Sequence, residues 1–320
     1  MKAAVLNQLG DIPFYGEIAK PTPGTSEQVL IAVETASIKQ LDKLKVSGKH
    51  YTGFASFPTT VGVDGVGRLD NGQRVYATGI TGMIAEYALA TRENCIPVPD
   101  DLSPEVAAVL PNALLGSDAA LICRGHMQAG EVVLINGATG VSGRMAVQSA
   151  RLRGAKRIIA TGRNPQALDY LKTIGADVCI SLRDDEQSIL AQLAQIQQET
   201  PIDQVLDYLW GQPTALLLQA FATCCPQPVN VITIGQMASA TLELPSAILR
   251  SKPVNLLGSG FGSISAAQMK HYNHTHLPQL FAQAAQGKLS ADYEAYPLTE
   301  VAAAWQATPA PGARIVIKVS

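Results

Sequence analysis

The sequence predicts an α/β protein in which a doubly wound parallel sheet accompanies a strand-rich N-terminal region. Residues 1–100 read as short extended runs separated by glycines and prolines, which is typical of strands and turns. Residues 130–258 alternate short apolar strand patterns with helical patterns, and that alternation favours a parallel sheet covered by helices on both faces. A strand pattern at 132–135 enters a glycine turn and then a helix, as the first unit of such a sheet does.

Length and composition limit the classes of protein that this chain can belong to. The 320 residues exceed one ordinary domain and suit two, and a chain of this size needs no disulfide or metal to fold. Hydrophobic residues make up 47% and charged residues 16%, which excludes a disordered chain and a coiled coil. The 24 basic and 26 acidic residues give a net charge of −2, without an electrostatic footprint for nucleic acid or anionic lipid. We therefore expect neither nucleic acid nor a membrane as a partner.

The sequence also indicates the compartment. No window reaches about 18 consecutive apolar residues, as a transmembrane helix would require. The apolar run Met1–Leu6 is too short for a signal peptide and predicts a first strand instead. The five cysteines are odd in number and lack CxxC spacing, which indicates buried free thiols in a reducing environment. We therefore expect a cytoplasmic protein.

In the N-terminal region, three strand patterns lie at 27–33, 73–77 and 85–90. Six glycines between positions 62 and 82 indicate turns or close backbone approaches rather than helix. The pattern changes at Ser103-Pro104-Glu105, where an N-cap residue, a proline and an acid predict the start of an apolar helix.

The middle region supplies the alternating strands and helices of the parallel sheet. The predicted strands are Val132–Ile135, Arg157–Ala160, Val205–Leu209 and Val229–Ile234, and the predicted helices are 142–153, 165–174, 187–198 and 213–223. The chain then ends with a predicted helix at 278–287 and a strand at 314–319.

The most specific motif is the turn Gly137–Gly143, which joins the first of these strands to its helix. Gly140 permits a pyrophosphate to approach the backbone, Gly143 permits close helix–strand packing, and free N–H groups at the helix start supply an anion site. Ala138 stands where the pattern G-x-G-x-x-G has its first glycine. A structural turn without a ligand is the alternative. The residues assigned to the cofactor here are Thr139, Gly140, Val141 and Ser142.

The end of the second strand indicates which dinucleotide binds. A dinucleotide fold usually has an acid there for the ribose 2′-hydroxyl, but this chain reads Thr161-Gly162-Arg163. Without a carboxylate a 2′-phosphate is not repelled, and a guanidinium can pair with it through two hydrogen bonds. We therefore assign these three residues to the cofactor and expect NADPH rather than NADH. A solvated surface arginine is the alternative for Arg163.

Short motifs, each ordinary by itself, extend over the whole chain. In order they are Ala36–Gly48, Pro58–Gly67, Gln73–Ala77, Ala85–Tyr87, Pro97–Ser103, Leu110-Pro111, Gly137–Gly143, Lys172–Asp177 and Asp203–Asp207. Together they resemble the medium-chain dehydrogenase/reductase superfamily, in its zinc-free quinone oxidoreductase branch. The resemblance implies a mostly β, GroES-like barrel substrate domain at 1–109 and 256–320, with a Rossmann NADPH-binding domain at 110–255 inserted into it and the active site in the cleft.

The resemblance also implies where zinc-dependent members of the superfamily would hold their catalytic zinc. Those ligand positions fall on Lys39, Val63 and Asn112. Valine has no donor and lysine is normally protonated, so we expect no metal site. The branch often has an asparagine near position 39, and Lys39 departs from that pattern.

Lys39 and Asp64 are the candidate catalytic residues that the resemblance implies. Without zinc, another group must stabilise the negative charge that develops on a carbonyl oxygen when hydride arrives. The resemblance directs Lys39 into the vacated ligand position and places Asp64 beside it. The ammonium would then polarise the oxygen or donate its proton, while Asp64 holds the lysine. The alternative is an ion pair that replaces the metal only structurally.

Further cofactor contacts are implied at Asn112, Gly235, Phe261 and Arg314. Gly235 ends a strand near the nicotinamide ribose, and Phe261 lies in the run 258–263 of the cofactor cleft, for which a flexible loop is the alternative. Arg314 stands where relatives often have Gly-Lys before the last strand.

We therefore expect an NADPH:quinone oxidoreductase-like enzyme, which transfers hydride to quinones or to activated C=C and C=O compounds. An enoyl or 2-alkenal reductase using the same cleft is the alternative, and a catalytically silent NADPH-binding relative is the second. The resemblance also implies a homodimer through exposed edge strands, with Pro253–Gly258 as the candidate edge.

Overall fold

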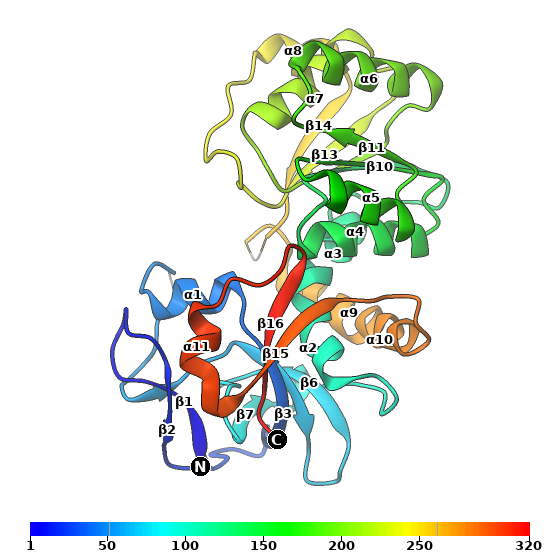
Figure 1. The fold of residues 1–320 in the computed structure, drawn as a ribbon. Coiled ribbons are helices and arrows are strands. Elements are labelled where there is room, and N and C mark those ends of the chain that lie inside the picture. Colours follow the sequence, from blue (N-terminus) through cyan, green and yellow to red (C-terminus); the bar gives the residue numbers. More distant parts are fainter. Residues whose placement is uncertain (51, 261) are drawn as a thin grey trace. The chain divides into compact units, whose positions relative to one another are not determined.

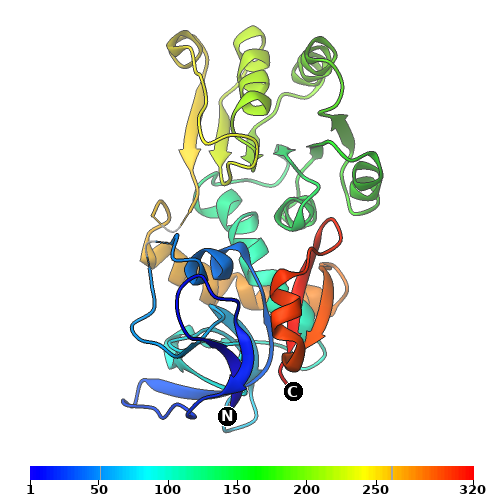
Figure 2. The ribbon, with the colours of Figure 1, turned by 60° about the vertical axis from the view of Figure 1, so that its left-hand side comes forward.

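The chain forms two compact units. We call Met1–Pro111 together with His271–Ser320 the terminal unit, and Asn112–Lys270 the inserted unit. Both ends of the chain belong to the terminal unit (Figure 2). Figure 1 shows the computed structural model, which describes residues 1–50, 52–260 and 262–320.

The inserted unit is built on a six-stranded parallel sheet in the order β11-β10-β9-β12-β13-β14. Its strands are β9 (Val132–Asn136), β10 (Arg157–Gly162), β11 (Val178–Ser181), β12 (Gln204–Asp207), β13 (Val229–Thr233) and β14 (Val254–Gly258). From β9 the chain continues to one side through β10 and β11, and then crosses to β12 on the other side of β9. The strand order therefore reverses between β9 and β12, where such sheets form a binding crevice at their carboxyl ends.

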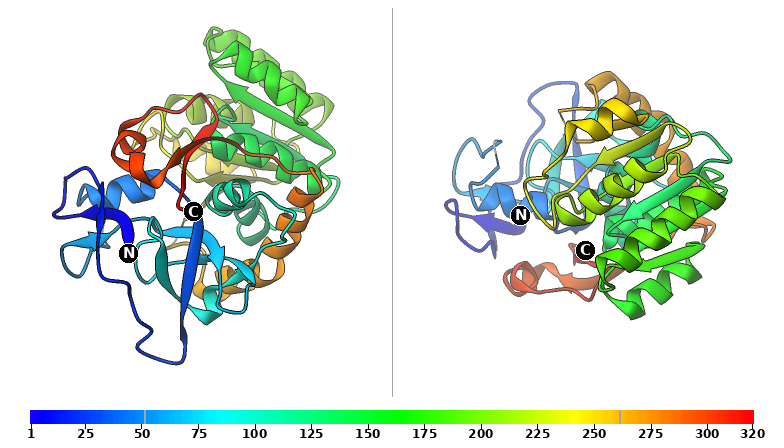
Figure 3. Two further views of the ribbon diagram at one scale, coloured as in Figure 1. Left: turned by 60° about the horizontal axis from the view of Figure 1, so that its bottom comes forward. Right: turned by 90° about the horizontal axis from the view of Figure 1, so that it is seen from above.

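Helices cover both faces of this sheet (Figure 3, right). They are α3 (Asp118–Cys123), α4 (Val141–Leu152), α5 (Pro165–Thr173), α6 (Glu186–Glu199), α7 (Gln212–Thr223) and α8 (Ser246–Ser251). Val133 and Ile135 of β9 share a core with residues of α3, α4 and α5, whereas Val132 and Leu134 share the other core with α6 and α7. Alternate side chains of one strand thus face opposite helical layers, and the predicted doubly wound sheet is confirmed.

The terminal unit is mostly β, as predicted. One sheet has the order β2-β1-β4, and the other has β15-β16-β3-β5-β6-β8, with β7 paired to β3. Its strands are β1 (Lys2–Leu6), β2 (Phe14–Glu17), β3 (Gln28–Ser37), β4 (Thr59–Thr60), β5 (Asp64–Arg68), β6 (Arg74–Thr78), β7 (Tyr87–Thr91), β8 (Ile96–Pro97), β15 (Asp292–Pro297) and β16 (Ala313–Lys318). Leu6 of the first sheet and Ile31 of the second belong to one buried core.

The remaining helices are short. They are α1 (Gln40–Val46), α2 (Pro104–Leu115), α9 (Ala266–Thr275), α10 (Leu277–Ala285) and α11 (Val301–Gln306), with 3-10 turns at Arg92–Asn94 and Leu298–Glu300. Figure 2 shows α11 beside β15 and β16, against which it packs. The last segments of the chain thereby complete the larger sheet, in which β16 pairs with β3, and contribute to the core that contains Leu6.

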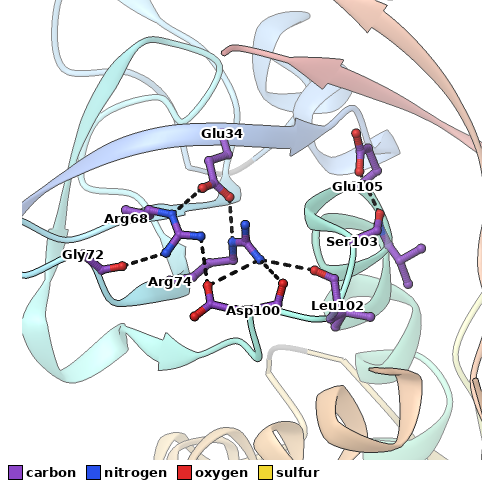
Figure 4. Close-up of polar contacts among 9 residues, drawn as sticks. Glu34, Arg68, Gly72, Arg74, Asp100, Leu102, Ser103 and Glu105 are labelled. Carbon is purple, nitrogen blue, oxygen red and sulfur yellow. Dashed lines mark hydrogen bonds and ion pairs between the residues drawn. The ribbon is translucent and has the colours of Figure 1, made fainter. Parts of the chain in front are cut away.

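An ion-pair network joins three strands of the terminal unit to the segment that leads into α2 (Figure 4). Glu34 on β3 accepts hydrogen bonds from Nε of Arg68 and from Nε of Arg74, each at 2.8 Å. Arg68 also bonds the carboxylate of Asp100 at 2.9 Å, and Arg74 bonds its backbone oxygen at 3.0 Å. Because both guanidiniums bridge the same two acids, the network fixes this end of the sheet.

One helical run has the length and composition that a membrane span would need. It is Pro104–Cys123, with a mean hydropathy of 1.7. However, 72% of this window is buried within the protein, as in the core helix of a globular fold, so the run is weak evidence for a span. The five cysteines are free thiols, but only Cys123 is buried and the other four are half-buried, so the expectation of burial was wrong for those four.

The structure corrects the predicted domain boundary at 255/256. That boundary would cut β14, which pairs with β13 in the register Val229↔Val254 to Thr233↔Gly258. Because every residue of β14 pairs with β13, the inserted unit extends at least to Gly258, and its compact body ends at Lys270, within α9. Its first residue is Asn112 rather than the predicted 110. Strand β11, which was not predicted, is only four residues long and has one fully buried residue, Ile180.

Candidate functional site

Residues that carry chemistry gather in two places, one within each unit. In the inserted unit they surround a cavity of about 490 Å³, which we call the loop cavity. In the terminal unit they surround the ammonium group of Lys39, and we call Ser37, Lys39, Asp42, Asp64 and Tyr76 the lysine cluster.

The glycine turn after β9 has the geometry that its sequence predicts. Gly137 has a φ of 86°, which favours glycine, and a Cβ there would lie 2.7 Å from the side chain of Leu209. A Cβ on Gly143 would lie 2.5 Å from Cα of Ala138, so the turn packs directly on the helix. No atom lies within 4 Å of a Cβ on Gly140, so space remains beside the backbone there.

The start of α4 supplies unpaired donors beside this space. Gly140 is the N-cap residue and provides no side-chain hydrogen bond to the helix. The N–H groups of Val141, Ser142 and Gly143 therefore have no acceptor within the helix. Together with the positive end of the helix dipole, they form a site for an anion such as a phosphate.

The loop cavity collects residues from the carboxyl ends of five strands, β9 to β13, and from the loops that follow them. Its lining residues are Gly137, Thr139, Gly140, Gly162, Arg163, Asn164, Leu182, Arg183, Tyr208, Leu209 and Met237. Four of the predicted cofactor residues are among them, namely Thr139, Gly140, Gly162 and Arg163. Sequence analysis missed Arg183, which follows the short strand β11, and the apolar residues of the wall.

The charged side chains of this lining are all positive. Arg163 and Arg183 both line the cavity, whereas no aspartate or glutamate does among the residues that the structure describes. A Cβ on Gly162 would overlap the side chain of Thr139, so a carboxylate has no room at the position where it would bind a ribose hydroxyl. The cavity therefore has the charge and space for a phosphate group on the ribose.

A buried hydrogen-bond chain holds the strand ends beneath the cavity. The N–H of Gly137 donates to Oγ1 of Thr161 at 3.0 Å, and that hydroxyl donates to Oδ1 of Asn136 at 2.7 Å. Nδ2 of Asn136 donates to Oδ1 of Asp207 at 2.9 Å, and Oγ1 of Thr214 donates to Oδ2 of Asp207 at 2.7 Å. Thr161, predicted as a cofactor contact, is buried within this chain and does not line the cavity.

A second cavity in the inserted unit, of about 500 Å³, contains another predicted residue. Gly235 lines it together with Trp210, Thr233 and residues on both sides of position 261. Trp210 has a φ of 56°, an uncommon conformation for a tryptophan. Phe261 itself lies outside the described residues. Asn112, which lies half-buried in α2, lines neither of these cavities.

In the lysine cluster, Lys39 immediately precedes α1. The carboxylate of Asp42 accepts a hydrogen bond from the backbone N–H of Lys39 at 2.8 Å, which caps the helix. The side chain of Lys39 is buried, and its Nζ lies 2.7 Å from Oδ1 of Asp64 and 2.7 Å from the carbonyl oxygen of Ser37. Oδ2 of Asp42 lies at 3.3 Å from the same nitrogen. The predicted Lys39–Asp64 pair is thus present, and Asp42 was missed although it lies only three residues away.

The ammonium of Lys39 is held in its charged form. Burial disfavours the charge, but the carboxylates of Asp42 and Asp64 outweigh it and raise the pKa of Lys39 above its ordinary value. Oδ2 of Asp64 accepts a hydrogen bond from the hydroxyl of Tyr76 at 3.0 Å. Burial, reinforced by the charge of Asp64, raises the pKa of Tyr76 well above its ordinary value, so this hydroxyl remains a donor.

Arg314, predicted as a cofactor contact, is the second residue of β16 in the terminal unit, and its charge interacts with the lysine cluster. Its charge lowers the pKa of Lys39, and it interacts with Asp42 and Asp64. Burial lowers the pKa of Arg314 itself, and its Nε has no hydrogen-bond partner in the described part of the chain.

The positions that zinc ligands would occupy do not assemble a metal site. Val63 contributes only its N–H, which donates to Oδ1 of Asp42 at 2.7 Å. Within residues 1–50, 52–260 and 262–320, no three His, Cys, Asp or Glu side chains gather where they could hold a metal ion. That the protein works without zinc stays a prediction.

Known proteins that this chain resembles include dehydrogenases and quinone reductases. A family model described as "Zinc-binding dehydrogenase" matches residues 142–273. The chain is 28% identical to a probable NADPH-dependent quinone reductase, tdiC, of Emericella nidulans, over 95% of this chain and 96% of the relative. It is 32% identical to the putative quinone oxidoreductase YhfP of Bacillus subtilis, over 73% of this chain and 78% of the relative.

A solved structure supports the same fold. The quinone oxidoreductase of Thermus thermophilus, determined alone and with NADPH, superposes with a TM-score of 0.76 over the whole of both chains, at 24% identity. The predicted arrangement, a Rossmann unit inserted into a GroES-like unit, is thereby confirmed.

Proposed function

Because this chain belongs to the medium-chain dehydrogenase/reductase superfamily, in its quinone oxidoreductase branch, it is an oxidoreductase, and we propose that it reduces quinones or activated C=C and C=O compounds with NADPH. A small molecule is therefore its substrate. The names of the relatives support the reaction class, and the loop cavity supports the choice of cofactor.

The observation that carries the proposal is the loop cavity. Its floor is a glycine turn with free N–H donors, and its wall has two arginines and no acid among the lining residues. A pyrophosphate fits the helix start because donors and dipole both favour negative charge there. A 2′-phosphate fits beside Arg163, since Gly162 leaves neither a carboxylate to repel it nor room for one. These features favour NADPH over NADH.

When bound, NADPH supplies a hydride from its nicotinamide ring. The chain itself binds and orients the cofactor through Thr139, Gly140 and Arg163, while the chain of bonds from Gly137 to Asp207 holds their backbone in place. The substrate must then receive a proton on the oxygen or carbon that gained negative charge. Lys39 is a poor source of that proton, because its raised pKa keeps the proton on nitrogen.

We also propose that the reaction needs no zinc, on the chemistry of the residues at the ligand positions. Neither the side chain of Val63 nor a protonated Lys39 can coordinate a metal. The ammonium of Lys39 instead forms ion pairs with the carboxylates of Asp42 and Asp64.

The test is an assay of the purified full chain with NADPH and with NADH against a panel of quinones and a panel of enones. We expect turnover with NADPH and slower turnover with NADH. Treatment with a chelator should leave the rates unchanged, and elemental analysis should find no stoichiometric zinc. Tight binding of NADPH without turnover on either panel would contradict the reductase. Activity that chelation abolishes and zinc restores would contradict the metal-free mechanism.

A further inference from the structure

We propose that Arg183 is a second ligand of the cofactor's 2′-phosphate and shares with Arg163 the discrimination between NADPH and NADH. This inference rests on the proposed function, because it concerns the same loop cavity. It adds a specificity residue from a different strand, 20 positions along the chain.

The parallel pairing of β10 and β11 brings the two arginines to one place. Gly162 pairs with Ser181 at the last position of the ladder. One residue further, the N–H of Leu182 still donates to the carbonyl oxygen of Gly162 at 2.8 Å. Arg163 and Arg183 each follow these residues, and both line the loop cavity.

The backbone at Arg183 is fixed, and its guanidinium is not engaged. The N–H of Arg183 donates to Oγ of Ser181 at 3.2 Å, which turns the chain at the end of β11. The side chains of Arg163 and Arg183 are exposed. In the described parts of the chain, neither guanidinium makes a hydrogen bond or an ion pair, so both remain available for an anion.

The acids that follow Arg183 do not cancel its charge within the cavity. The carboxylate of Asp185 accepts from the N–H of Ser188 at 2.9 Å and from its hydroxyl at 2.7 Å, and so caps α6. Asp184 is not among the lining residues. The lining therefore carries two positive charges that no acid of the lining balances.

A ribose 2′-phosphate matches this pair in charge and in hydrogen bonding. Such a group carries nearly two negative charges and three acceptor oxygens at neutral pH. One guanidinium can neutralise one charge and bond two oxygens, which leaves charge and an acceptor for a second. NADH presents a hydroxyl at the same place, so neither arginine gains an ionic contact with it.

The test measures dissociation constants of the full chain for NADPH and NADH in four variants: Arg183→Ala, Arg163→Ala, both together, and Arg250→Ala as control. Arg250 is also exposed and lies in α8, which leads into β14 at the opposite edge of the same sheet. Competition by adenosine 2′,5′-bisphosphate and by adenosine 5′-monophosphate examines the phosphate without the nicotinamide half.

We expect Arg183→Ala to raise the dissociation constants for NADPH and for the bisphosphate by about tenfold or more, as the loss of one charge-assisted contact does. Binding of NADH and of the monophosphate should change less than about twofold, and the double variant should bind both dinucleotides about equally. The Arg250→Ala protein should bind all four ligands like the wild type.

Two results would overturn the inference while leaving the proposed function intact. One is a selective loss of NADPH affinity in Arg163→Ala, while the ratio of the dissociation constants for NADPH and NADH is unchanged in Arg183→Ala. The other is an equal loss of affinity for both dinucleotides in Arg183→Ala, which would place Arg183 outside the 2′-phosphate site. A wild-type protein that binds NADH as tightly as NADPH would instead contradict the proposed cofactor preference itself.

Discussion

At the scale of single residues, Lys39 is a charged side chain that is almost fully buried. Its ammonium donates hydrogen bonds to the carboxylate of Asp64, to the carbonyl oxygen of Ser37 and to the hydroxyl of Ser37, and it forms an ion pair with Asp42 at 3.3 Å. A substrate oxygen would have to displace one of these partners. The geometry therefore favours a role in which Lys39 holds two acids together, rather than one in which it stabilises an oxyanion.

We predict that Lys39→Met destabilises the protein by about 3–5 kcal/mol, because Asp42 and Asp64 lose the charge that compensates them in a buried site. Turnover per folded molecule should stay within a few fold. Thermal unfolding and NADPH-dependent turnover, measured on the same samples, decide this, with the exposed Lys49→Met as control. An unchanged melting temperature with turnover about 100-fold lower would instead show that the ammonium stabilises an oxyanion.

At the scale of elements, Asp207, the last residue of β12, joins the end of β9, helix α7 and the loop that follows β12. Besides Asn136 and Thr214, it accepts from the N–H of Leu209 at 3.1 Å and from the N–H of Trp210 at 3.3 Å. Both of these loop residues line cavities of the inserted unit. One carboxylate thus fixes the phosphate turn relative to the wall opposite it.

We predict that Asp207→Asn lowers the free energy of unfolding by about 1–3 kcal/mol, because an amide cannot accept from all four donors and leaves buried groups unpaired. Since the turn serves both dinucleotides, affinities for NADPH and NADH should fall by the same factor, unlike in Arg183→Ala. Denaturant unfolding and ligand titration check this. The exposed Asp169→Asn, which loses only a surface pair with Lys172, should leave both quantities nearly unchanged. A selective loss of NADPH in Asp207→Asn would contradict the positioning role.

At the scale of the whole molecule, we propose a homodimer through the edge strand β14. It is the last strand of the six-stranded sheet, so its outer edge has no partner strand in the described residues. Leu256 and Leu257 there are only half-buried. An unpaired apolar edge invites association, and pairing with a second copy would satisfy its backbone groups. Light scattering at micromolar concentration should give twice the chain mass of 33.8 kDa. A mass of 33.8 kDa at all concentrations would refute the dimer.

Local patterns by themselves determined the phosphate turn and most elements of the doubly wound sheet. The strand at 132–135, its glycine turn and its helix appear where the sequence predicts them, because apolar periodicity, glycine and the N-cap act within a few residues. The missing acid at Gly162 was equally visible. Resemblance over the whole chain, and not local pattern, supplied the Lys39–Asp64 pair.

Only the tertiary structure decided which distant side chains meet. The ladder between β10 and β11 brings Arg183 to the cavity of Arg163, and the packing of β9 against β10 turns Thr161 inward to Asn136. The assignment of β14 to the inserted unit likewise follows from its pairing with β13, not from a change in composition. Strand register depends on contacts between residues far apart in the chain, and a sequence pattern of period two fixes which residues alternate but not which partner each one faces.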